Sequence, residues 1–210
     1  MSFSWSQILH TTALQAEILG LAPQGSIREV QRSATCSMSR AVSRRVPLLL
    51  FAVAWGTNHF VPMLLVYRAK LGLSAVDLAI LFGVYAVGLL PGLLLGGPLS
   101  DHVGRRPVVL PASLVALAGT CILACGAAGF PVLLLGRLVI GLGSGATFSA
   151  GTAWVQDLAQ AEAPGTGARR AAVALSSGFG GGPLITGFLA QWLPSPMSVP
   201  YAVQAAVLVS

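Results

Sequence analysis

The chain has 210 residues, of which 55% are hydrophobic and only 9% are charged, and its formal net charge is +6. Soluble globular domains carry about a quarter charged residues, so this composition excludes an ordinary soluble fold and indicates a polytopic membrane protein. No basic patch is interleaved with aromatic residues, which argues against a nucleic-acid partner.

The first 45 residues are polar, and their second half is rich in arginine and poor in acids. They contain no early apolar core of the kind that a secretory signal needs. The same composition is compatible with an organelle transit peptide, but we expect residues 1–45 to form a partly disordered cytoplasmic tail. Residues 5–21 fit a weakly amphipathic helix lying on the membrane surface.

A membrane-spanning helix needs about 20 predominantly apolar residues. Five segments meet this requirement, at about 46–67, 76–100, 107–127, 132–153 and 171–193. A sixth apolar segment, residues 200–210, makes only about 15 Å of helix, which is half of a hydrocarbon core. We therefore expect an all-α membrane bundle over residues 46–210 whose sixth helix is truncated, and we interpret the sequence as incomplete.

The basic residues predict how the helices are threaded. Nine of the 12 Lys and Arg residues fall in three places, namely Arg28, Arg32, Arg40, Arg44 and Arg45, then Arg105 and Arg106, then Arg169 and Arg170. These places alternate with nearly uncharged turns, which is the positive-inside pattern. We expect a multi-pass protein of a bacterial inner (plasma) membrane with a cytoplasmic N-terminus. Arg68 and Lys70 then lie on the external side, against the positive-inside distribution.

The first apolar segment carries polar groups midway along it, in Trp55-Gly-Thr-Asn58-His59-Phe-Val-Pro62. An unpaired amide is costly in hydrocarbon, so Asn58 should line a cavity, bond another helix or satisfy the carbonyl that Pro62 leaves free. His59 titrates near neutral pH and is suited to carrying protons. We predict that Trp55 and Asn58 line a substrate cavity and that His59 acts in proton coupling.

A short charged turn separates the second and third apolar segments. It reads Gly97-Pro-Leu-Ser-Asp101-His-Val-Gly104-Arg105-Arg106-Pro107. The helix dipole disfavours an acid at a helix C-terminus, so Asp101 needs a partner, and Arg105 follows four residues later. Gly104 permits a tight turn. This Gly-x-x-x-Asp-x-x-Gly-Arg-Arg pattern resembles the signature between the second and third helices of major facilitator superfamily transporters.

The resemblance implies a role for this turn. In the family, the matching acid and arginine join an acid at the end of helix four in a charge network that latches the outward-facing state, and Asp157 occupies that place here. The predicted latch residues are Gly97, Asp101, Gly104, Arg105, Arg106 and Asp157. His102 stands where the family usually has Arg or Lys, which predicts a weaker or pH-dependent latch.

Arg137 is the only ionised group in the interior of a predicted span, since Asp77 lies at the very start of the segment 76–100. An arginine at mid-membrane costs about 2.5–3.5 kcal/mol and should face the protein interior, although snorkelling to the nearby interface is the alternative. It shares a helical stripe with Gly141 and Gly145, a spacing that lets helices approach closely. The run Arg137–Gly145 resembles the helix-four motif of proton-coupled drug antiporters, which implies proton coupling or gating for Arg137.

The fifth segment contains Gly178-Phe-Gly-Gly-Gly182-Pro183-Leu-Ile-Thr-Gly187. Consecutive glycines before a proline weaken the helix and allow a bend or a close crossing. The Gly-Pro-x-x-x-Gly core resembles the antiporter motif of the same superfamily, which favours export over uptake. Thr186 replaces a small residue of that motif, and its upstream glycine is missing.

Taken over residues 46–210, the resemblance implies the N-terminal half of a transporter in which two six-helix bundles alternate access to a midplane site. We expect efflux of a small organic solute driven by a proton gradient, with no cofactor or metal, and with the second half absent from this chain. The alternatives are an uptake permease of the same superfamily and a truncated, non-transporting half or membrane scaffold. We expect no enzyme, because the loops hold no nucleophile–base pair.

Overall fold

A computed structural model describes residues 42–43, 45–192 and 198–209 of the chain. The chain divides after Val42, and the fold below is that of the unit Ser43–Ser210. Five of its helices are long and apolar enough to cross a membrane, and they are Arg45–Leu71, Ala75–Val103, Arg105–Ala124, Phe130–Leu158 and Thr166–Trp192. The regular elements of the described residues are all helical, which confirms the all-α class. The predicted tail lies almost wholly outside the described residues.

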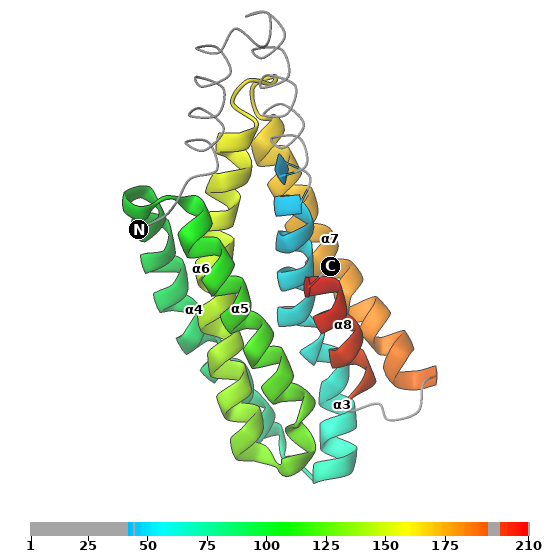
Figure 1. The fold of residues 1–210 in the computed structure, drawn as a ribbon. Coiled ribbons are helices and arrows are strands. Elements are labelled where there is room, and N and C mark those ends of the chain that lie inside the picture. The colour runs from blue at the N-terminus through cyan, green and yellow to red at the C-terminus, as the bar shows by residue number, and fades with distance from the viewer. Residues whose placement is uncertain (1–41, 44, 193–197, 210) are drawn as a thin grey trace, which may run out of the picture. The chain divides into compact units, whose positions relative to one another are not determined.

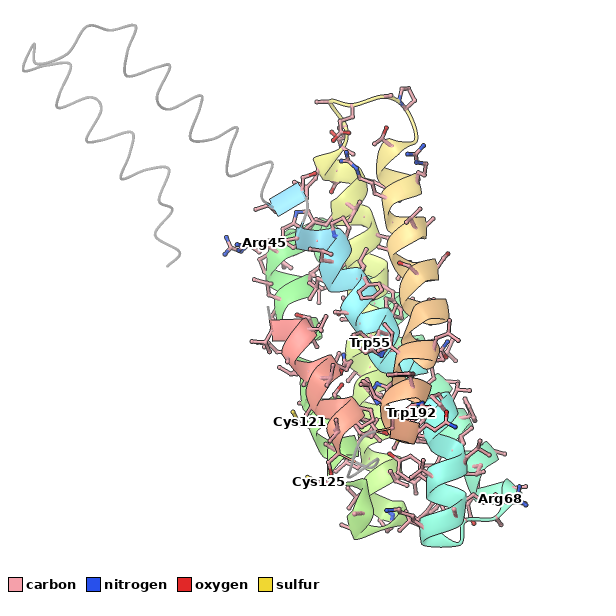
Figure 2. The ribbon with its side chains drawn as sticks, turned by 90° about the vertical axis from the view of Figure 1, so that its right-hand side faces the viewer. Arg45, Trp55, Arg68, Cys121, Cys125 and Trp192 are labelled. Atoms are coloured by element: carbon pink, nitrogen blue, oxygen red, sulfur yellow. The ribbon has the colours of Figure 1, made fainter. Side chains whose placement is uncertain are left out.

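The first span is interrupted halfway. Residues 45–58 are helical, His59 is a turn, and helix α3 then covers Phe60–Leu71. Pro62 has no amide hydrogen to donate to the carbonyl four residues before it, which weakens the helix at this point. The span ends at Gly72, whose φ of +66° is the left-handed conformation that glycine adopts without strain. Figure 2 shows Arg45 and Arg68 toward opposite ends of this span.

Helices α4 (Ala75–Val103) and α5 (Arg105–Ala124) are joined by a single residue, Gly104, with φ +95°. Helix α4 begins with a capping box, in which Ser74 and Asp77 each accept a hydrogen bond from the other's backbone amide. The one-residue connection forces the end of α4 and the start of α5 to lie next to each other. It therefore places Asp101 and Arg105 at the same edge of the bundle.

The remaining helices are η1 (Gly126–Ala128), α6 (Phe130–Leu158), α7 (Thr166–Trp192) and α8 (Val199–Val209). Helix α6 extends five residues beyond the predicted end of this span at residue 153. Asp157 therefore lies in the last helical turn of α6. Figure 1 shows α4, α5 and α6 grouped on one side, with the first span, α7 and α8 on the other.

Glycines bring α6 into backbone contact with α4 and α5. A Cβ atom on Gly141 would lie 2.4 Å from the carbonyl oxygen of Tyr85 on α4, and one on Gly88 of α4 would lie 2.4 Å from that of Leu138. A Cβ atom on Gly143 would lie 2.3 Å from the amide nitrogen of Ala116 on α5. Because lipid gives no hydrophobic drive between helices, such close approach is a main source of their association.

Candidate functional site

The side chain of Arg105 links the ends of three helices. Its Nε donates to Asp157 Oδ2 at 2.8 Å, and its Nη1 donates to Asp101 Oδ1 at 2.5 Å. Asp101 ends α4, Arg105 begins α5 and Asp157 ends α6, so one guanidinium spans all three. The structure thus brings together three of the four charged residues that the sequence assigned to the latch, and leaves Arg106 outside the network.

A fourth member of this network, Ser100, was missed in the sequence. Arg105 Nη1 also donates to Ser100 Oγ at 2.7 Å, and that hydroxyl donates to the carbonyl oxygen of Gly97 at 2.7 Å. Ser100 is only 1% exposed. Ser100 lies five residues before Arg105 in the sequence. This spacing indicates a contact only when the geometry of the one-residue turn at Gly104 is known.

The helix dipoles oppose each charge of the network taken separately. Asp101 and Asp157 lie at helix C-termini and Arg105 at a helix N-terminus, and each of these placements is unfavourable. Pairing removes the penalty. Side-chain exposure is 22% for Arg105, 60% for Asp101 and 42% for Asp157, so water reaches all three groups. Each exposed pair is therefore worth about 1 kcal/mol or less, which makes the contact easy to reverse.

The other predicted latch residues have different surroundings. Arg106 is exposed, and its side chain pairs with none of the described acids. A Cβ atom on Gly97 would lie 2.8 Å from Ser149 Oγ of α6. Gly97 and Gly104 thus shape the backbone, while Arg105 alone makes the charged contacts. A separate ion pair, Arg170 Nη1 to Glu162 Oε1 at 2.7 Å, joins the α6–α7 loop to α7.

Arg137 lies in the interior of the bundle, 1% exposed, so the snorkelling alternative does not describe this structure. Its Nε donates to the carbonyl oxygen of Leu81 at 3.3 Å and its Nη1 to that of Thr57 at 3.2 Å. The guanidinium carbon lies 4.4 Å from the ring centre of Phe60 and 4.3 Å from that of Tyr85. Aromatic faces and carbonyls, rather than a carboxylate, surround this charge.

The two residues predicted to line a cavity join the first span to α7 in this structure. Asn58 Nδ2 donates to the carbonyl oxygen of Phe179 at 2.8 Å, and Trp55 Nε1 donates to Thr186 Oγ1 at 2.9 Å. Of the alternatives open for Asn58, bonding to another helix is the one observed. Trp55 is 4% exposed and lies midway along the first span, beside α7 (Figure 2).

The glycines of α7 make these contacts possible. A Cβ atom on Gly182 would lie 2.6 Å from Cδ1 of Trp55, and one on Gly178 would lie 2.6 Å from the carbonyl oxygen of Phe51. Pro183 lies inside the helix, one residue after Gly182. The predicted packing stripe on α7 therefore faces the first span.

His59 is completely buried, and neither of its ring nitrogens has a hydrogen-bond partner. Its ring lies 4.2 Å from that of Tyr201 on α8, in a T-shaped arrangement. The hydroxyl of Tyr201 is hydrogen-bonded to that of Tyr67 on α3. Sequence reasoning missed both tyrosines, because they are 134 residues apart and meet only through helix packing.

Comparison with known proteins identifies relatives of this chain. The model of the Major Facilitator Superfamily matches residues 48–210. The quinolone resistance protein NorA of Staphylococcus aureus is 27% identical over 142 residues, which is 68% of this chain and 36% of NorA. Facilitated glucose transporter member 10 of the mouse is 42% identical over 78 residues, which is 37% of this chain and 14% of the transporter. The chain thus spans about a third of the length of NorA.

Proposed function

The chain belongs to the major facilitator superfamily, and we propose that it forms the N-terminal half of a secondary transporter that exports a small organic solute in exchange for protons. It is an integral, multi-pass membrane protein with five apolar helices of spanning length. NorA, a quinolone resistance protein, supports export. A second six-helix half would complete the transport path.

The observation that carries this proposal is the network of Arg105 with Asp101, Asp157 and Ser100. It ties together the ends of α4, α5 and α6 through contacts that water can replace. We propose that the network holds one state of an alternating-access cycle and opens in the other state. The energy of the exposed pairs is small, which suits a contact that is broken and remade in each cycle.

Arg137 and His59 would couple this cycle to protons. Arg137 of α6 is buried against α4 and the first span, and His59 is buried between the first span and α8. Intramembrane ionisable residues are costly and commonly mark ion or proton pathways. The proposed orientation, with the N-terminus and the α4–α5 turn cytoplasmic in a bacterial inner membrane, follows the distribution of arginines.

Facilitated uptake is the second candidate, because the mouse facilitated glucose transporter member 10 is 42% identical over the 78 residues that it matches. The two functions differ in their dependence on a proton gradient. Efflux by exchange requires the gradient to move solute uphill, whereas facilitated diffusion only equilibrates solute.

Transport in everted membrane vesicles distinguishes the two candidates. With the full-length protein and an acidic vesicle lumen, a quinolone should accumulate several-fold, and collapsing the pH gradient with an ionophore should abolish the accumulation. Glucose that equilibrates at the same rate with and without the gradient would support uptake instead. Failure of both solutes, and of a wider panel of organic cations and sugars, would contradict the proposed transport activity.

A further inference from the structure

Three buried polar atoms among the described residues have no hydrogen-bond partner. They are Nδ1 and Nε2 of His59 and Oε1 of Gln204. His59 is 0% and Gln204 is 1% exposed. Each unpaired buried group costs about 1–3 kcal/mol, and native proteins leave few of them without a reason.

All three atoms lie along the contact between the first span and α8. Gln204 Nε2 donates to the carbonyl oxygen of Ala52 at 3.1 Å, and a Cβ atom on Gly56 would lie 2.5 Å from the same nitrogen. Ala52, Gly56 and His59 follow one another at helical spacing and share a face of the first span. Tyr201, three residues before Gln204 on α8, lies against the ring of His59.

The unpaired atoms are chemically complementary. A protonated imidazole has two N–H donors and needs two acceptors, whereas a neutral one has a single donor. The free Oε1 of Gln204 is an acceptor, and the hydroxyl oxygen of Tyr201 can accept a second hydrogen bond. The helix contact therefore carries the two acceptors that a protonated His59 would require, but in the packing seen here neither one is bonded to the ring.

The charges around His59 make its protonation depend on conformation. Arg137 of α6 is the charged group that acts on it, and Tyr201 of α8, whose hydroxyl is bonded to that of Tyr67 of α3, lies against its ring. The first span and α8 contain no Asp or Glu, and the carboxylates of α4 and α6 bond elsewhere, Asp77 to Ser74 and both Asp101 and Asp157 to Arg105, so none of them offsets a second positive charge at His59. A proton on His59 is thus stabilised only if α8 supplies its acceptors or if Arg137 moves away.

We propose that His59, Gln204 and Tyr201 form the proton-binding site of the transport cycle, with α8 as the element that opens and closes it. The proton adds to the lone pair of the unprotonated ring nitrogen, and the two N–H groups then donate to Gln204 Oε1 and Tyr201 Oη. The proton returns to water on the opposite side of the membrane when α8 repacks as seen here. The inference rests on the proposed proton-coupled transport and adds Gln204 and Tyr201 to it.

The test is the pH profile of gradient-driven solute transport by the full-length protein in proteoliposomes. Gln204→Leu removes the acceptor and should shift the midpoint of the profile to lower pH by about one unit, since a hydrogen bond to a charged group is worth about tenfold in a protonation equilibrium. Gln204→Glu supplies a negative acceptor and should shift the midpoint upward. Gln191→Leu is the matched control, because Gln191 is exposed on α7.

The outcomes separate the inference from the function on which it rests. Midpoints of both Gln204 variants that coincide with that of Gln191→Leu would overturn the proposed site, while gradient-driven transport by the unmodified protein would still stand. If the unmodified protein moves solute with no dependence on the gradient, proton coupling itself is refuted. If Gln204→Leu does not insert stably into the membrane, Gln204→Glu alone tests the site: an upward shift of the midpoint supports it, and an unchanged midpoint overturns it.

Discussion

Arg105 and Asp157 are 52 residues apart in the chain, yet their side chains meet at 2.8 Å at one end of the bundle. The contact joins the first turn of α5 to the last turn of α6, and the same guanidinium also reaches Asp101 at the end of α4. A bond between two helix ends that water can reach is sensitive to any relative movement of those helices. In the proposed transport cycle, the network would therefore open when these helix ends move apart.

The first prediction concerns the charge of Asp157. Asp157→Asn keeps the shape but removes the attraction, and an exposed pair worth about 1 kcal/mol changes a two-state equilibrium by about fivefold. We expect a shift of that size in the accessibility of single cysteines that report the two states of the full-length protein. Glu162→Gln, which breaks the ion pair with Arg170 outside the network, is the control. Equal accessibility in both variants would exclude the latch.

Ser100 provides a second test of the same network. Ser100→Ala removes an acceptor from Arg105 without altering any charge, and we expect a smaller shift than with Asp157→Asn, in the same direction. Ser113 is the matched control, since it is also a buried serine bonded to a carbonyl of its own helix, but it contacts no charged group. The shift in each variant is measured by the accessibility of the same reporter cysteines. A Ser100→Ala protein that behaves like Ser113→Ala would show that the hydroxyl does not position Arg105.

The glycine contacts between α4 and α6 predict a change in stability. A Cβ atom on Gly145 would lie 2.3 Å from the carbonyl oxygen of Leu89, whereas one on Gly180 of α7 would meet nothing within 4 Å. Alanine is the better helix former by about 1 kcal/mol, but a clash with backbone costs about 1–3 kcal/mol. Gly145→Ala should therefore lower the thermal unfolding temperature in detergent, and Gly180→Ala should leave it unchanged or raise it. The reverse order would contradict the observed packing.

Because the charge of Arg137 is buried, we predict that its replacement affects thermal stability and transport differently. The guanidinium is desolvated without a carboxylate partner, so Arg137→Met, of similar size, should leave the thermal unfolding temperature unchanged or raise it. If Arg137 acts in coupling, gradient-driven transport should fall about tenfold or more, as expected for an intramembrane charge on a proton pathway. Arg68→Met, at an exposed position, is the control. A large loss of stability together with transport would indicate a purely structural role.

Several features of the protein followed from the sequence alone. The apolar segments and the all-α class could be predicted because lipid cannot satisfy backbone hydrogen bonds, which leaves helices as the solution for such runs. The Asp101–Arg105 pair is local, since four residues across a one-glycine turn determine its geometry. The family resemblance rested on the turn around Asp101 and Arg105 and on the motifs of the fourth and fifth apolar segments, and the match over residues 48–210 confirms it.

Helix packing decided what the sequence left open. Asp157 and Ser100 reach Arg105, Phe60 and Tyr85 enclose Arg137, and Tyr201 covers His59 only because α4, α5, α6 and α8 meet at particular rotations. The spacing of residues within one helix indicates which of them share a face, but not which partner helix that face will meet. Trp55 and Asn58 illustrate the difference, because their polarity was evident in the sequence and their contacts with α7 were not. Those contacts depend on the glycines of another helix, more than 120 residues away.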